Sequence, residues 1–251
     1  MATSMTQAEF NAMLQIAIAQ GLPGGVYTSK FGTGEEIDAA LDGGAQAAVT
    51  AVKNRSVTLA ASGLQEYLDS LPRLVTENLT ISVTGSLNTG VNLQGFYGPG
   101  SIVINGNSNF TLYGSLQISR CNLYIAVQNV TFDGSKQSGT YSQTITSYSR
   151  TVAFRNCNFL GGPGNALAIN SDGAARIIVV SPEIKNVYIA VSAQSGSIIS
   201  VTGTAVASGN KTGADAYAGI VLLGPTIPQT LGGAANTNRS GLIVGANGTL
   251  L

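Results

Sequence analysis

The apolar residues of this chain change their spacing at about residue 72, from the period of a helix to that of a strand. In the first stretch, "TQAEFNAMLQIAIAQ", Thr6 and Glu9 have the spacing of a capping box, which marks a helix start. The residues that follow form one apolar helical face, which consists of Phe10, Met13, Leu14, Ala17 and Ile18. The sequence "GLPGG" at 21–25 ends this predicted helix.

A second helix is predicted where Thr33 and Glu36 form another capping box. Its apolar and small residues are spaced four, three, four and three positions apart, and they are Ile37, Leu41, Gly44, Ala48 and Ala51. A seam with this heptad-like spacing suits helices that associate between chains. A surface helix that packs on its own domain shows the same spacing, so both interpretations stay open.

A third helix is predicted at "SGLQEYLDSLP", immediately before the spacing changes. Ser62 and Gln65 have capping-box spacing, and Pro72 follows near the end. The apolar stripe of this helix consists of Leu64, Tyr67, Leu68 and Leu71. A helix in this position can cover the first coil of a stacked β-structure, whose bare edge would otherwise recruit further strands.

The rest of the chain consists of short alternating runs, and several of them begin with asparagine. "NLTISV" at 78–83 and "NLYIAV" at 122–127 align without gaps with "NFTLYG", "NVTFDG", "NCNFLG" and "NVYIAV". After each asparagine the first, third and usually fifth residues are apolar. Because side chains alternate between the two faces of a strand, we expect Leu123, Ile125 and Val127 to point inward and Tyr124 to point outward.

Strands of this kind cannot bury an apolar side alone, and stacking each on the next builds a continuous core. The sequence therefore predicts an all-β main domain, a parallel β-helix with about six or seven coils across residues 78–224. Asparagines at the bends tolerate a left-handed backbone, and their amides can hydrogen-bond from coil to coil. A β-sandwich is the rival prediction, but it needs tight hairpin turns, which are few here.

The predicted organisation has three parts. Residues 1–60 form a short α-helical N-terminal region for attachment and oligomerisation, and residues 61–77 hold the capping helix and a lead-in strand. Residues 78–251 form the β-helix with a C-terminal closing segment. Because the chain ends in the apolar sequence "SGLIVGANGTLL", we expect this end to contact another chain or to fold back on the solenoid.

The composition of the chain disfavours several classes of function. Only 10% of the 251 residues are charged, the 12 basic and 12 acidic residues cancel, and no basic patch suited to nucleic acid is visible. No apolar run approaches the length of a membrane span, and no secretory signal is apparent. The chain has no histidine, and Cys121 and Cys157 lie in separate strand-like runs. We therefore expect no metal, no cofactor and two small buried thiols.

Two stretches resemble known phage proteins. "YTSKFGTGEEIDAAL" is similar to a segment near the start of many tail-fibre and tail-appendage proteins in phages and prophages of Gram-positive gut bacteria. "LQEYLDSLPRLVTENLTISVTGSL" and "LQGFYGPGSIVING" resemble the pectate-lyase-like right-handed β-helix of similar phage proteins. Together the stretches cover residues 27–42 and about 64–135. The resemblance implies a homotrimeric virion protein, made in the bacterial host cytoplasm and joined to other tail or baseplate proteins by its N-terminal part.

Some β-helices of phage origin cleave polysaccharides, so the charged residues of the solenoid are candidates for catalysis. A glycoside hydrolase needs two carboxylates about 5–10 Å apart, whereas a lyase needs a base and a group that neutralises the substrate carboxylate. The candidates are Asp133, Asp172, Glu183, Asp215, Lys136, Arg150, Arg155, Arg176 and Lys185.

None of these groups forms a clear acid–base pair in the sequence. Asp133 and Asp172 lie in turn signatures, Glu183 and Lys185 share a strand face and can pair, and Arg155 and Arg176 can stack if their coils are in register. We predict no catalytic residues and no enzyme, with a polysaccharide lyase or glycoside hydrolase as the alternative.

Tyr113, Tyr124 and Tyr188 are predicted to point outward and are the candidate ligand-binding residues. Aromatic faces pack on sugar rings and on neighbouring subunits, although strand propensity alone also explains tyrosine at these positions. The predicted function is that of a structural phage-tail protein whose partners are its own copies, other tail proteins and host surface glycans. A bacterial surface adhesin is a second alternative, which the lack of a visible signal peptide or wall anchor disfavours.

Overall fold

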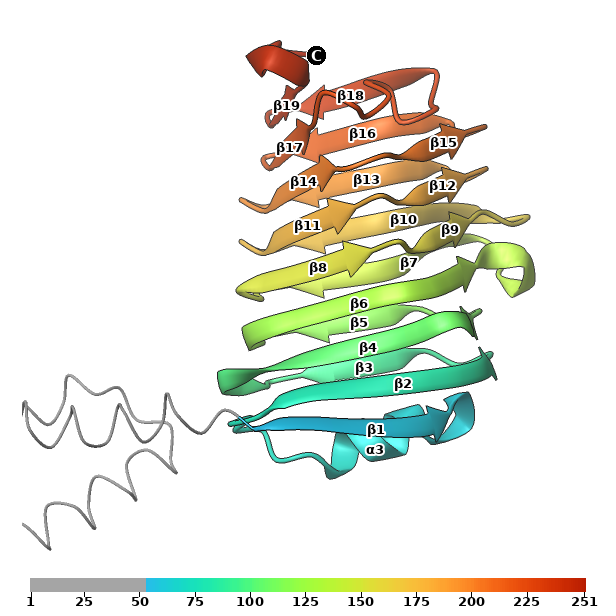
Figure 1. The fold of residues 1–251 in the computed structure, drawn as a ribbon. Coiled ribbons are helices and arrows are strands. Elements are labelled where there is room, and N and C mark those ends of the chain that lie inside the picture. Colours follow the sequence, from blue (N-terminus) through green and yellow to red (C-terminus); the bar gives the residue numbers. More distant parts are fainter. Residues whose placement is uncertain (1–52) are drawn as a thin grey trace, which may run out of the picture. The chain divides into compact units, whose positions relative to one another are not determined.

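The structure is a computed structural model that describes residues 53–251. These residues form a parallel β-helix of about eight turns, which confirms the predicted fold (Figure 1). The first two predicted helices and the candidate seam lie outside the described residues; the seam residues are Ile37, Leu41, Gly44, Ala48 and Ala51.

The larger sheet runs along the solenoid and lies in front in Figure 1. Its main path consists of β1 (Asn54–Ala60), β2 (Asn78–Leu87), β4 (Tyr97–Leu112), β6 (Asn122–Asp133), β8 (Thr151–Arg155), β11 (Arg176–Val180), β14 (Ile198–Thr202), β17 (Ile220–Leu223) and β19 (Leu242–Val244). In the upper coils it continues beyond a bend with β9 (Asn158–Leu160), β12 (Glu183–Lys185) and β15 (Val206–Ser208).

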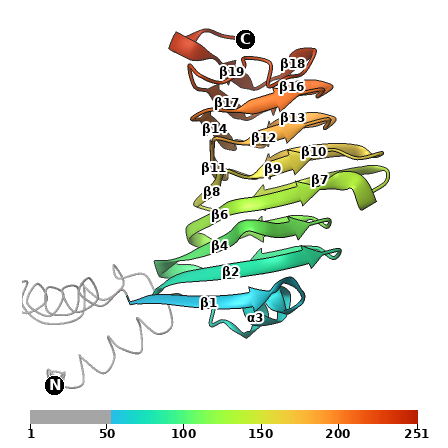
Figure 2. The same ribbon diagram turned by 45° about the vertical axis from the view of Figure 1, so that its right-hand side comes forward.

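The smaller sheet lies behind the larger one, as the turned view in Figure 2 also shows. It consists of β3 (Val91–Gln94), β5 (Leu116–Ser119), β7 (Thr140–Ser147), β10 (Asn165–Asp172), β13 (Ile189–Gln194), β16 (Thr212–Tyr217) and β18 (Ala235–Arg239). Every pairing between the named strands of residues 53–251 is parallel. A β-sandwich would contain antiparallel hairpins, so the rival prediction is wrong.

Inward side chains of successive coils stack directly on one another. One such ladder runs through Leu79, Ile102, Ile125, Val152, Ile177, Ile199, Val221 and Ile243. Each of these side chains is at most 1% exposed, and the first seven give the predicted number of coils within residues 78–224. Leu123, Ile125 and Val127 are buried while Tyr124 is partly exposed, so the predicted alternation is confirmed.

The asparagines that begin the hexapeptides occupy two different places. Asn129, Asn156 and Asn186 lie at bends with φ of 55°, 50° and 56°, as predicted. By contrast, Asn78 and Asn122 are the first residues of β2 and β6 and have an extended backbone, so the bend prediction is wrong for them. Hydrogen bonds between side-chain amides of adjacent coils occur at both places. Asn129 donates to Asn105 over 3.0 Å, and Asn78 donates to Asn54 over 3.1 Å.

A short helix covers the lower end of the solenoid, as predicted. After the turn η2 (Ala61–Gly63), α3 (Leu64–Ser70) buries Leu64 and Leu68 against the first coils. The predicted capping box is wrong, because Gly63 is the N-cap and no side chain caps the helix. Gln65 instead exchanges two hydrogen bonds with the backbone of Asn92, at 2.7 and 3.2 Å, and so attaches the helix to β3.

The solenoid begins earlier than the sequence suggested. β1 precedes the helix and pairs in parallel with β2 from Asn54 to Ala60, although these residues were assigned to the N-terminal region. Only two strand positions of β1 are even partly buried, and they are Val57 and Leu59, which pack against the edge of the core. This weak burial explains why the alternation of β1 is hard to see in the sequence.

At the other end the chain folds back on itself, which was one of the two expected outcomes. After η4 (Ala246–Gly248), Leu250 forms an antiparallel bridge with Val244, and the amide of Leu251 donates to the carbonyl of Ile243 over 3.0 Å. The side-chain oxygen of Gln229 accepts a hydrogen bond from the amide of Ala246 over 3.0 Å. These bonds close the last coil within the chain.

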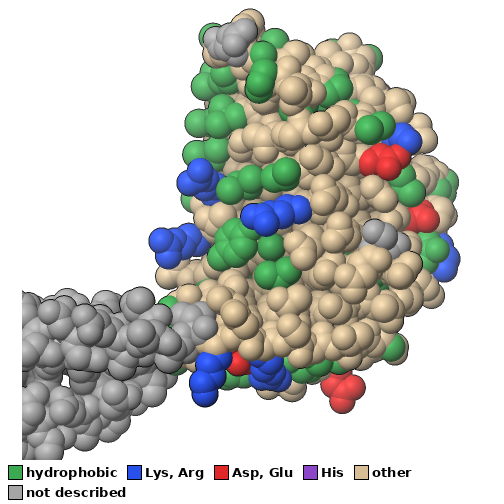
Figure 3. Space-filling view, in the orientation of Figure 1, with side chains coloured by type: hydrophobic (Ala, Val, Ile, Leu, Met, Phe, Trp, Pro, Cys, Tyr) green, Lys and Arg blue, Asp and Glu red, His purple; other side chains and the backbone are tan. Residues whose placement is uncertain are grey.

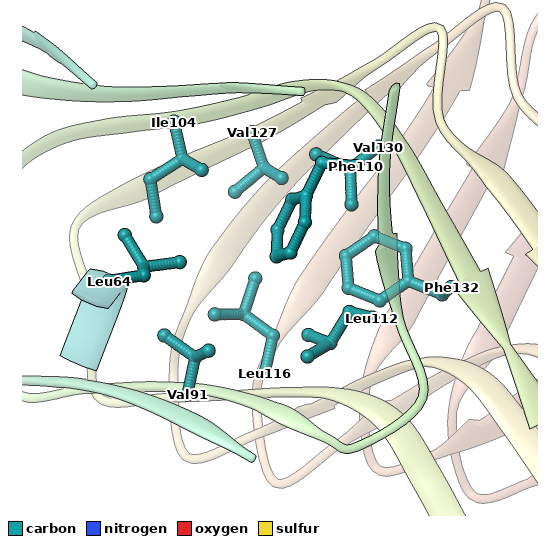
Figure 4. A pocket seen from close by; sticks show the side chains of 9 residues that line it. All are labelled: Leu64, Val91, Ile104, Phe110, Leu112, Leu116, Val127, Val130 and Phe132. Carbon is teal, nitrogen blue, oxygen red and sulfur yellow. The ribbon is translucent and has the colours of Figure 1, made fainter. Parts of the chain in front are cut away.

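A small void lies inside the lower coils, between α3 and the two sheets (Figure 4). It has a volume of about 10 Å³ and is lined by Leu64, Val91, Ile104, Phe110, Leu112, Leu116, Val127, Val130 and Phe132. Because this lining is wholly apolar, it gives a water molecule no hydrogen-bond partner. The void is therefore part of the core and not a ligand site.

Candidate binding surface

The outer face of β4 to β19 changes its chemical character halfway up the solenoid. Two outward ladders run side by side there, two strand positions apart. The first ladder is Ser101, Tyr124, Thr151, Arg176, Ile198, Ile220 and Leu242. The second ladder is Val103, Ala126, Ala153, Ile178, Ser200, Leu222 and Val244. The lower part of the first ladder holds polar and aromatic residues, whereas the upper part of both ladders is aliphatic except for Ser200.

The aliphatic part is termed the apolar stripe, and it consists of Ile178, Ile198, Ile220, Leu222, Leu242 and Val244. Leu222 and Leu242 are 38% and 37% exposed, and the other four are partly exposed. The stripe adjoins the chain end, because Val244 bridges to Leu250, which is 69% exposed. Figure 3 shows hydrophobic side chains gathered along the upper left of this face. Contiguous exposed apolar side chains of this kind mark interaction surfaces.

Below the stripe, Tyr124 and Arg155 are joined across the face. Nη2 of Arg155 donates to the hydroxyl of Tyr124 over 2.9 Å, so the bond links β8 to β6. Ala126 and Ala153 occupy the ladder between these two side chains. Both alanines point outward, yet they are only 2% and 1% exposed, because the larger side chains around them close over them. The arrangement holds one aromatic ring at a defined position on the surface.

Two further arginines lie beside this pair. Arg176 directly precedes Ile177, and Arg150 lies two residues before Val152, which is the partner of Ile177 in the sheet. Both side chains are exposed, and within residues 53–251 neither forms an ion pair. The four residues Tyr124, Arg150, Arg155 and Arg176 are termed the arginine–tyrosine patch.

The predicted stacking of Arg155 on Arg176 is wrong. In the observed register Arg155 lies opposite Val180, which is four positions beyond Arg176 on the same strand. At about 3.3 Å per residue this offset is about 13 Å, so the two arginines occupy opposite sides of the patch. The two arginines are this far apart because the register of their strands is set by the inward side chains and not by the arginines.

The three candidate tyrosines point outward, as predicted, but they do not form one site. Nζ of Lys136 lies 3.8 Å from the ring centre of Tyr113, which follows β4, and Nζ of Lys211 lies 4.5 Å from that of Tyr188, which precedes β13. Each of these two rings therefore already has a cationic partner on its face. Only Tyr124 belongs to the arginine–tyrosine patch.

Two of the candidate carboxylates, Asp133 and Glu183, are engaged in local contacts. Asp133 accepts a hydrogen bond from the amide of Ser135 over 2.8 Å and so caps the turn η3 (Gly134–Lys136), which agrees with its predicted turn role. Glu183 forms an ion pair with Lys185, as predicted from their spacing. Both interactions are local, which is why sequence reasoning could find them.

The contact between Asp215 and Arg239 was missed by sequence reasoning. Asp215 is 2% exposed and accepts hydrogen bonds from Nε of Arg239 over 3.1 Å, from Nη2 of Arg239, and from the hydroxyl of Ser192 over 3.4 Å. The hydrogen bond and charge of Asp215 raise the pKa of the Arg239 guanidinium. The only sequence signal is the separation of 24 residues, which is the length of about one coil.

Both cysteines are buried, as predicted, and neither forms a disulfide bond. Burial raises the pKa of the Cys157 thiol to about 12, and burial also raises the pKa of Cys121. The thiolate is the reactive form of cysteine, so these groups act as core side chains. Residues 53–251 contain no group of three or more His, Cys, Asp or Glu side chains that could hold a metal ion.

Comparison with known proteins finds no matching family model, no matching curated protein and no matching solved structure. Among the helices of residues 53–251, none has the length and apolar character needed to cross a membrane.

Proposed function

We propose that this chain is a structural protein of a phage tail fibre or tail appendage and that its copies pack side by side as a homotrimer. The resemblance of "YTSKFGTGEEIDAAL" to the start of such proteins supports the phage setting. The apolar stripe is the observation that carries the packing of copies. In this proposal residues 1–52 attach the protein to other tail or baseplate proteins.

The chemistry of the stripe favours a second copy of this chain as its partner. Its two ladders run along the solenoid axis with one residue per coil, so a neighbouring solenoid with a parallel axis presents the same spacing of about 4.8 Å. The stripe contains no charged residue, so two copies can approach without unpaired charges becoming buried. Closed rotational symmetry then lets every copy cover its stripe.

The proposed homotrimer can be tested by measuring its mass. We expect light scattering coupled to size exclusion to give three times the chain mass of 25.5 kDa at micromolar concentration. Leu222→Asp places a charge in the stripe and should release the monomer, because burying an unpaired carboxylate is costly. Val206→Asp is the matched control, since Val206 is 52% exposed on β15, outside the stripe. A monomeric wild-type protein, or a trimer that survives Leu222→Asp, would refute the role of the stripe.

We also propose that the protein binds surface polymers without cleaving them. This proposal is supported by the contacts of Asp133 and Glu183, whose carboxylates are engaged in a cap and an ion pair. The combined changes Asp133→Asn, Asp172→Asn and Glu183→Gln should leave binding to host cells unchanged. Reducing-sugar and unsaturated-product assays on wall and capsule glycans check the claim. Cleavage by the wild-type protein that disappears in the triple variant would favour the enzyme alternative.

A further inference from the structure

Arg150 directly precedes β8 and Arg176 is the first residue of β11, so the two arginines lie near the starts of paired strands on adjacent coils. Val152, which is two residues after Arg150, and Ile177, which is one residue after Arg176, are partners in the larger sheet. Positive charges that gather at one place on a surface raise the local concentration of anions. Both side chains are exposed and neither has an ion-pair partner within residues 53–251, so both guanidinium groups are accessible to a ligand. Such an arrangement is suited to a negatively charged ligand.

Tyr124 adds a flat apolar surface next to these charges. It lies in the same outward ladder as Arg176, with Thr151 between them, so about 10 Å separates the two backbones. The hydrogen bond from Arg155 fixes the ring and leaves it partly exposed. Tyrosine rings pack well against sugar rings, while guanidinium groups donate paired hydrogen bonds to carboxylate and phosphate oxygens.

We infer that the arginine–tyrosine patch binds a sugar or polyol polymer that carries carboxylate or phosphate groups. The ring of Tyr124 packs against the polymer backbone, and Arg150 and Arg176 bind its anionic groups. The inference deepens the proposed function and rests on it for the setting, in which a tail appendage contacts such polymers on a cell surface. The binding chemistry itself rests only on the patch.

Three polymers test the inference on the full chain, with affinities measured by biolayer interferometry. Polygalacturonate carries carboxylates, poly(glycerol phosphate) carries phosphates, and dextran is neutral. We expect binding to at least one anionic polymer, weakening as salt rises from about 50 to about 300 mM, because screening shortens the range of the attraction. Whichever anionic polymer binds identifies the charged group. Binding to dextran of equal strength, or no binding to either anionic polymer at low salt, would overturn the inference.

A matched pair of variants separates the patch from diffuse charge. Arg150→Gln combined with Arg176→Gln should weaken binding to the anionic polymer by about tenfold or more, through loss of two charge-assisted contacts. Lys136→Gln combined with Lys211→Gln removes the same net charge at the two other tyrosines and should stay within about twofold of wild type. Equal losses in the two variants would show that no defined site exists.

Light scattering on the same variants separates the test of the arginine–tyrosine patch from the test of the oligomer. Neither double variant changes a residue of the apolar stripe, so both should retain the mass of the wild-type oligomer in light scattering. An oligomer that fails to form in the wild-type protein contradicts the packing of copies but not the patch. Lost polymer binding with an intact oligomer in the Arg150 and Arg176 variant supports the patch.

Discussion

Phe159→Ala should lower the free energy of unfolding by about 3–5 kcal/mol, the largest single effect expected here. The Phe159 ring stacks on Phe132 with centroids 4.9 Å apart and planes inclined by 2°, and it meets Phe154 edge-on at 6.0 Å. All three rings are fully buried. Removing the Phe159 ring from this mutually packed group of three therefore leaves a cavity that the neighbouring strands, held by their ladder hydrogen bonds, cannot close. Chemical denaturation followed by circular dichroism measures the loss.

The adjacent residue provides the matched control. Leu160 lies next to Phe159 on β9, but its side chain points outward and is only partly buried. Leu160→Ala should therefore cost about 1 kcal/mol or less. Similar losses from the two variants would show that the inward and outward faces of β9 are assigned the wrong way round.

Arg239→Ala should destabilise the upper end of the solenoid by about 1–3 kcal/mol, because it leaves the buried Asp215 carboxylate without its strongest partner. Arg239 is on β18 and Asp215 is on β16, so their contact joins two adjacent coils of the smaller sheet. The effect should be local and should appear as faster amide hydrogen exchange in residues 235–251 before exchange increases elsewhere.

A double-mutant cycle isolates this contact from other effects of the substitution. Asp215→Ala combined with Arg239→Ala should be less destabilising than the sum of the two single changes, since the double variant leaves no buried charge unpaired. Additive losses would mean that the two side chains do not interact in solution. Uniformly faster exchange over all coils would contradict a local role for the pair.

Local patterns in the sequence determined which side of each strand is buried. The alternation in "NLYIAV" is enough to place Ile125 inside and Tyr124 outside, because the direction of a side chain on a strand depends only on its position. The same reasoning identified the cap of the lower end, since an amphipathic helix must bury its apolar face. It also identified the pair of Glu183 and Lys185, which are two residues apart on one strand.

The register between coils decides which outward residues lie next to each other. Local sequence patterns do not specify this register. Ile125 is 27 residues from its partner Val152, whereas Ile177 is 22 residues from Ile199, because loops and bends of different length separate the strands. An uncertainty of one or two residues in a coil moves every outward contact by one or two strand positions. The sequence therefore suggested a stacked pair of Arg155 and Arg176.

Only the tertiary structure brought together the residues of the two proposed surfaces. Tyr124 and Arg155 are 31 residues apart, and their hydrogen bond depends on the bends and strand ends of a whole coil. The apolar stripe likewise becomes visible only when the isoleucines and leucines of β11, β14, β17 and β19 are set in register. The inward core is fixed by local alternation, but an outer surface is fixed by non-local stacking, since each coil contributes only one residue to each ladder.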